Sequence, residues 1–135
     1  MSRIVVDTDV ASYIFNWHSL AKQYAELLRG SELIISFMTI AELRTGAISA
    51  RWGSRRSLLL EQFVQGFEHS YPDNELCTIY ARIRSHERAA GRTLSPQDAW
   101  IAATALALDA PLATNNRRHF EHIPNLQLFS TGPIR

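Results

Sequence analysis

The sequence predicts an α/β domain with a mainly parallel central sheet flanked by helices. Short apolar runs rich in β-branched residues recur along the chain, and they alternate with longer segments whose apolar residues have helical spacing. The 135 residues suffice for one domain with its own hydrophobic core, and no linker or internal repeat divides them. We therefore expect a single domain over residues 1–135.

Apolar runs mark the expected strands. Ile4-Val5-Val6 is a continuous β-branched run, which is typical of a strand buried on both faces. The other expected strands lie at residues 33–37, at an edge segment 69–71, at 111–114 and at 126–129.

Capping residues and apolar spacing mark the helices. Ser95-Pro96 joins a cap to a first-turn proline and predicts a helix to about Asp109, while Asp73 caps a long helix that Gly91 closes. The remaining helices are expected to begin near Thr8, after the cap Ser19, at Thr39, at Ser54 and near Arg117.

Composition fits an ordinary water-soluble protein, and its net charge of +1 neither demands nor excludes a nucleic-acid partner. Cys77 is the only cysteine, so an intramolecular disulfide is excluded. The longest apolar stretch, residues 99–108, is far shorter than the ~20 residues that span a bilayer. No signal-peptide pattern opens the chain, so we expect a cytoplasmic protein with no membrane partner.

Three acidic residues stand in apolar surroundings: Asp7 after the first strand, Glu42 in the segment 38–43, and Asp98 at the start of an alanine-rich helix. Buried carboxylates are costly without a compensating positive charge, and a divalent cation is the usual compensator where several converge. Oxygen ligands without zinc-type spacing of Cys or His favour Mg²⁺ or Mn²⁺. The alternative for each acid is helix capping: a capping box for Glu42, a favourable helix dipole for Asp98, and an N-cap at Asp7 or Asp9.

Four segments, taken together, resemble the PIN-domain family and look most like its VapC-type toxins of bacterial toxin–antitoxin pairs. They lie in the family's order and spacing at residues 5–9, 39–43, 95–103 and 112–120. The resemblance implies an endoribonuclease that hydrolyses RNA phosphodiester bonds through a water activated by Mg²⁺ or Mn²⁺. It also implies a homodimer that a protein antitoxin holds inactive.

The resemblance places the catalytic metal ligands at Asp7, Glu42 and Asp98. Relatives often carry a fourth acid where this chain has Asn116 or His119, which leaves open whether one or two metals bind. Asn116 could hold a metal-bound water, and His119 could contact phosphate or carry a proton, although a plain surface histidine explains it as well. Asp9 stands beside the first ligand, with helix capping as its alternative.

RNA must be held by cations, and Arg117 and Arg118, with Thr114, are the candidates nearest the expected site. Arg84, Arg88 and Arg92 recur every four residues on the long helix, where a solvated polar face explains them at least as well.

Two rival functions stay open at this stage. A haloacid-dehalogenase-like phosphatase would use Asp7 as nucleophile and Asp9 as acid, but it needs a downstream lysine, and the only lysine is Lys22. A catalytically weak or inactive PIN-fold module that only binds RNA and antitoxin is the other.

Overall fold

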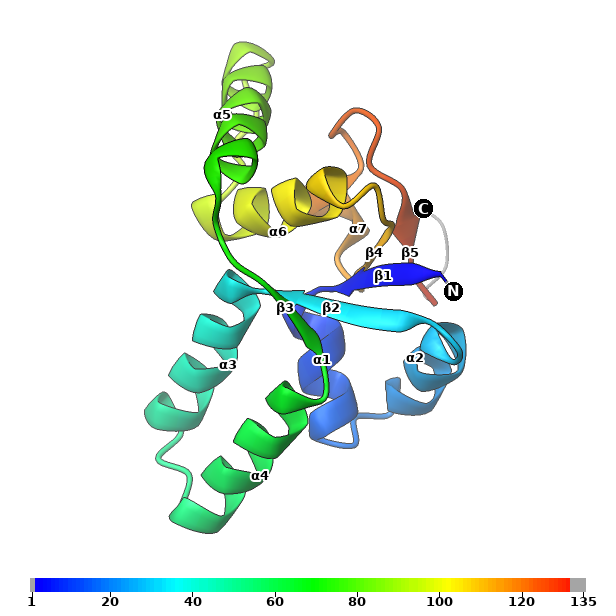
Figure 1. Cartoon of the computed structure of the whole chain (residues 1–135), viewed down its shortest axis with the longest axis vertical. Helices are drawn as coiled ribbons and strands as arrows, with labels where there is room; N and C mark the ends of the chain where they lie inside the picture. The colour runs from blue at the N-terminus through cyan, green and yellow to red at the C-terminus, as the bar shows by residue number, and fades with distance from the viewer. Residues whose placement is uncertain (1, 132–135) are drawn as a thin grey trace.

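Five short strands form one sheet in which every pairing is parallel (Figure 1). The structure, a computed structural model, describes residues 2–131. The strand order is β3-β2-β1-β4-β5. The strands are β1 (Arg3–Val6), β2 (Glu32–Ser36), β3 (Glu68–Ser70), β4 (Leu112–Ala113) and β5 (Leu128–Phe129). The predicted fold class is confirmed, and each expected strand is present with its ends moved by a few residues.

Seven helices within the described residues cover the two faces of the sheet. They are α1 (Thr8–Phe15), α2 (Ala21–Leu28), α3 (Phe37–Ser49), α4 (Ser54–Gln65), α5 (Asn74–Ala89), α6 (Pro96–Ala107) and α7 (Arg117–Phe120). Figure 1 shows α1 to α4 on one side of the sheet and α5 to α7 on the other. In the part of the chain that the structure describes, no helix combines the length and apolar character of a membrane span.

The alternation of side chains along β1 divides the core between these layers. Ile4 and Val6 are buried with residues of α1 to α4, whereas Val5 is buried with residues of α5 and α6. Because successive side chains of a strand point to opposite faces, a continuous apolar run suits a strand covered on both sides. The fully buried alanines of α6, such as Ala99 and Ala103, allow that helix to pack closely on the sheet.

Two expected helix starts were wrong. Ser36, at the end of β2, has an extended backbone, and its Oγ accepts from Met38 N at 3.1 Å, so α3 begins at Phe37 and not at Thr39. The cap expected at Ser19 is also absent, since α2 begins at Ala21 after Leu20, which makes no side-chain capping bond. The caps Asp73 and Ser95 are confirmed.

The order of the strands decides where a site can form. The chain leaves β1 for β2 and β3 on one side, and later returns to β4 on the other side of β1. The crevice beyond the carboxyl ends of β1 and β4 is therefore the point where strand order switches, which is where open α/β sheets bind ligands. Asp7 follows β1 directly and Thr114 follows β4 directly.

Candidate functional site

Asp7 lies at this switch point and is held by the ends of both neighbouring strands. It is the N-cap of α1, and its side chain is only 6% exposed. Its Oδ1 accepts from Thr8 N at 2.7 Å, and its Oδ2 accepts from the hydroxyl of Thr114 at 2.7 Å. The capping alternative is thus correct for one oxygen, while the second oxygen is fixed by a residue 107 positions away.

Glu42 reaches the same edge of the sheet from α3. The hydroxyl of Thr8 donates to Glu42 Oε1 at 2.8 Å and lies 3.0 Å from the hydroxyl of Thr39. Because α3 begins at Phe37, Thr39 is inside the helix and Glu42 is not at a capping position. The capping-box alternative for Glu42 is therefore wrong, and its side chain turns toward the residues that follow β1.

Asp98 lies on the first turn of α6, and its side chain is paired with α7. Its backbone N–H donates to Ser95 Oγ at 3.1 Å, while its Oδ2 lies 2.9 Å from His119 Nδ1. Asn116 Nδ2 lies 3.1 Å from the same histidine nitrogen. His119 thus contacts a predicted metal ligand, and its role at the site stays a prediction.

A second network joins Asp9 to the helix α2. Asp9 Oδ1 accepts from Val10 N at 2.7 Å, and its Oδ2 accepts from Asn115 N at 3.1 Å. The hydroxyl of the fully buried Tyr24 donates to Asn115 Oδ1 at 2.7 Å. Sequence reasoning missed Tyr24 and Asn115, because a tyrosine at helical spacing reads only as a core residue.

Burial and mutual repulsion make the carboxylates of this edge hard to ionise. Desolvation, followed by the charge of Asp9, raises the pKa of Asp7 from 3.8 to about 8. Desolvation is also the largest cause of the raised pKa values of Asp9 and Glu42, and the charge of Asp98 raises both further. The four acids from three separate segments therefore act on one another electrostatically, as residues of a common site do.

Among residues 2–131, no lysine or arginine forms an ion pair with these carboxylates. In this described part of the chain, the pair between Asp98 and His119 is the only ion pair that includes a carboxylate of the site. A hard divalent cation suits a donor set made of carboxylate oxygens that lack a cationic partner. Over the same residues, no three Asp, Glu, His or Cys side chains are close enough to hold an ion as they stand. Shared coordination by Asp7, Glu42 and Asp98 therefore requires their side chains to move closer together.

The three residues expected to bind RNA differ in their exposure. Arg118 is exposed and Arg117 is half-buried, and neither forms an ion pair with a described residue. Thr114 is fully buried, and its hydroxyl donates to Asp7. Its side chain therefore supports the carboxylate and does not face a solvent-side ligand.

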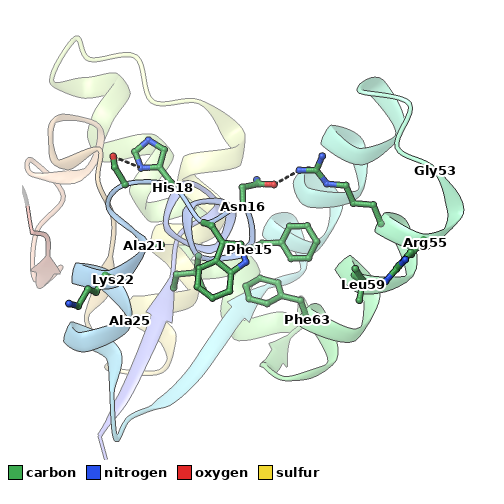
Figure 2. A pocket seen from close by; sticks show the side chains of 14 residues that line it. Phe15, Asn16, His18, Ala21, Lys22, Ala25, Gly53, Arg55, Leu59 and Phe63 are labelled. Atoms are coloured by element: carbon green, nitrogen blue, oxygen red, sulfur yellow. Dashed lines mark hydrogen bonds between the residues drawn. The ribbon is translucent and has the colours of Figure 1, made fainter.

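A separate apolar groove of about 1200 Å³ lies between the end of α1, α2 and α4. Figure 2 shows Phe15, Leu59 and Phe63 pointing into it, with Lys22 and Arg55 at its margins. Trp17, 88% exposed, also lines the groove. Trp52 is not free to meet a partner with its whole ring, because it stacks on Phe15 and carries the Arg56 guanidinium 3.8 Å above it.

Comparison with known proteins identifies the family to which this chain is similar. The family model described as the PIN domain matches residues 4–126. Ribonuclease VapC1 of Haemophilus influenzae is 30% identical over 125 residues, which cover 91% of this chain and 93% of the relative. The tRNA(fMet)-specific endonuclease VapC of Shigella flexneri is 28% identical, covering 94% of this chain and 96% of the relative. The solved structure of VapBC2 from Rickettsia felis bound to a DNA fragment from their promoter matches with a TM-score of 0.85 and 26% identity, over 96% of this chain and 99% of that chain.

Proposed function

This chain belongs to the PIN-domain family and is a VapC-type ribonuclease toxin, and we propose that it cuts RNA with Asp7, Glu42 and Asp98 as ligands of Mg²⁺ or Mn²⁺. The observation that carries the proposal is the raised pKa of Asp7, Asp9 and Glu42, none of which forms an ion pair with a lysine or arginine of the described residues. Such a cluster is stabilised in its ionised form by a divalent cation.

Each proposed ligand is oriented by another residue of the chain. Thr8 N–H and the Thr114 hydroxyl fix the two oxygens of Asp7, and the Thr8 hydroxyl positions Glu42. Thr8 therefore links two ligands that come from different helices. When bound, the divalent ion supplies an activated water for attack on phosphorus and neutralises charge on the phosphate.

The chain's cations hold the RNA in this proposal. Arg117 and Arg118 follow β4 within four residues of Thr114, and Arg118 shares the wall of a cavity with Asp98. Arginine pairs with phosphate through two parallel hydrogen bonds, which fixes the strand as well as attracting it.

Cleavage of RNA with defined ends tests the function. We expect wild-type protein to cut bulk transfer RNA in Mg²⁺ or Mn²⁺, to leave 5′-phosphate and 3′-hydroxyl ends, and to be inactive in excess EDTA. Asp98→Asn should lower the rate by about 100-fold or more, because loss of a residue that only supports a ligand already costs 10- to 100-fold.

Asp109→Asn is the matched control. Asp109 is exposed, follows the other end of α6 and has a left-handed φ of 49°, which asparagine tolerates. Its rate should equal that of wild type. Cleavage that persists in EDTA, or equal loss of activity in both variants, would contradict the proposal.

The apolar groove is the proposed docking place of the antitoxin. An exposed apolar groove of this size on a single chain is typical of a protein-binding surface. Lys22, Arg55 and Arg56 at its margins favour an amphipathic segment that carries acidic residues. Co-expression with the protein encoded beside this gene, followed by co-purification, tests the partnership. The same material in light scattering tests the homodimer that the family resemblance implies.

The structure bears differently on the two rival functions, the phosphatase and the inactive binding module. The only lysine, Lys22, lines the groove between α1, α2 and α4 and does not contact the carboxylates, which removes the lysine that phosphatase chemistry needs. The module that only binds RNA remains the alternative to the nuclease, and RNA binding without any metal-dependent cleavage would favour it.

A further inference from the structure

A second recess, separate from the apolar groove, has Asp98 in its wall. It is a cavity of about 440 Å³ between the loop that joins α5 to α6 and the helix α7. Its wall includes Arg92 and Thr93 from the loop, Asp98 from α6, and Arg118 and His119 from α7. This volume is within the range of ~300–1,000 Å³ of small-molecule sites, so one nucleotide unit can enter.

The loop wall of this cavity is held in place by several interactions. Gly91, with a φ of 75°, turns the chain after α5, and Arg92 N then donates to Glu87 O at 2.9 Å. The Arg84 guanidinium donates to the carbonyl of Leu94, and Leu94 is itself buried in the core. The recess is therefore part of the fold and does not depend on a loose surface loop.

A buried carboxylate orients the first cation of the cavity. Glu87 is only 4% exposed, and its Oε2 accepts from Arg92 Nε at 3.0 Å and from Arg92 Nη2 at 2.8 Å. Removing a carboxylate from water is costly, so the pairing of buried Glu87 with Arg92, whose side chain is 35% exposed, is weakly explained by stability alone. It does fix the guanidinium plane, and no described residue bonds to Nη1, which is left to donate to a ligand.

The second cation has no anionic partner. Arg118 is exposed at the cavity, and no hydrogen bond or ion pair joins it to a described residue. The two acids in the wall are already engaged, Glu87 by Arg92 and Asp98 by His119. A ligand that enters therefore meets two guanidinium groups, one with a free Nη1 donor and one without an ion pair to a described residue, which favours a phosphate.

We propose that this cavity is the subsite for the phosphate of the RNA nucleotide next to the cleaved bond, with Arg92 and Arg118 as its ligands. Asp98 forms part of both the cavity wall and the carboxylate cluster, so a strand bound in one extends into the other. This inference rests on the proposed nuclease function. It adds a fixed position for the flanking nucleotide. It also gives Arg92 a role in binding, whereas a solvated polar face of the helix would explain its place in the sequence without one.

RNA binding in EDTA tests the subsite without any cleavage. The probe is a 5′-fluorescein-labelled single-stranded RNA of 12 nucleotides with random sequence, and the readout is fluorescence anisotropy of the full chain over a series of salt concentrations. Arg118→Ala should raise Kd about 5-fold or more. It should also lower the slope of log K against log salt by about 0.7, the value for one phosphate contact on a single strand.

Two further variants sharpen the test. Arg92→Lys keeps the charge and the pairing with Glu87 but removes the free Nη1 donor, and it should raise Kd by about 3-fold or more with little change of slope. Arg29→Ala is the matched control, because Arg29 is exposed at the end of α2, just before β2 begins, and therefore near the opposite edge of the sheet. Its Kd and slope should equal those of wild type.

The outcomes separate the subsite from the function. Arg118→Ala and Arg92→Lys proteins that are folded and bind the probe like wild type would overturn the subsite, even if wild type cuts RNA. Wild type that binds the probe, with the expected effects of both variants, but never cuts RNA with Mg²⁺ or Mn²⁺ would support the subsite and contradict the nuclease. Unchanged RNA affinity together with weakened antitoxin binding in Arg118→Ala would assign the cavity to a protein ligand and overturn the proposal.

Discussion

Replacing Asp7 by asparagine should change how the stability of the metal-free protein depends on pH. The pKa of Asp7 is raised from 3.8 to about 8, chiefly by burial. Between these two values the unfolded chain has released the proton while the folded chain retains it. The folded state therefore binds more protons, and its stability falls as pH rises through this window.

The size of the effect follows from the proton count. One proton held by the folded state corresponds to about 1.4 kcal/mol per pH unit, or about 2.7 kcal/mol between pH 5 and pH 7. For a domain of this size the loss lowers Tm by about 10 °C. The raised pKa values of Asp9 and Glu42 add to the wild-type slope in the same direction. Asp7→Asn removes one of these protons, so its Tm should fall less over the same range.

Thermal unfolding in EDTA at pH 5, 6 and 7, followed by circular dichroism, measures this difference. Mn²⁺ added at pH 7 should restore wild-type stability by about 2.7 kcal/mol at 100 times its Kd, and it should have a smaller effect on the variant. Asp73→Asn is the matched control, because Asp73 is also a helix N-cap, that of α5, and it is not among the groups that shift the pKa values of Asp7, Asp9 and Glu42. Asparagine remains a good cap, so this control should behave like wild type.

The reasoning would be refuted by an Asp7→Asn protein whose Tm falls with pH and responds to Mn²⁺ as in wild type. Failure of that variant to fold while Asp73→Asn folds would show that Asp7 acts mainly as a cap.

Other perturbations have equally direct outcomes. Tyr24→Phe removes the hydrogen bond to Asn115, so it should lower the free energy of unfolding measured in urea by about 1 kcal/mol and also lower the cleavage rate. Unchanged stability would show that the bond is not formed. Glu87→Gln should lower the free energy of unfolding at pH 7 by about 1–2 kcal/mol. Because Arg92 holds the pKa of Glu87 below 4.5, this difference from wild type should disappear in acid titration once the pH falls below the pKa of Glu87. Trp17→Ser should weaken capture of the antitoxin while the cleavage rate of free toxin stays the same; equal antitoxin affinity would remove the groove from the interface.

Local pattern predicted much of the molecule because it depends on near neighbours. The β-branched run of β1 and the caps Asp73 and Ser95 were identified by residue type alone. The start of α3 was missed, because Ser36 and Thr39 are both good caps and only the bend at the end of β2 selects between them.

The sequence by itself determined the alternation of strands and helices, which follows from apolar spacing, and its motif order pointed to the three acids proposed as metal ligands. Only the tertiary structure decided what each acid touches. Thr114 reaches Asp7 because β1 and β4 are neighbours in the sheet, and Thr8 reaches Glu42 because α1 and α3 cover the same face. Contacts between residues far apart in the chain depend on how strands are ordered, and that order is fixed by packing of the whole core and not by any local segment.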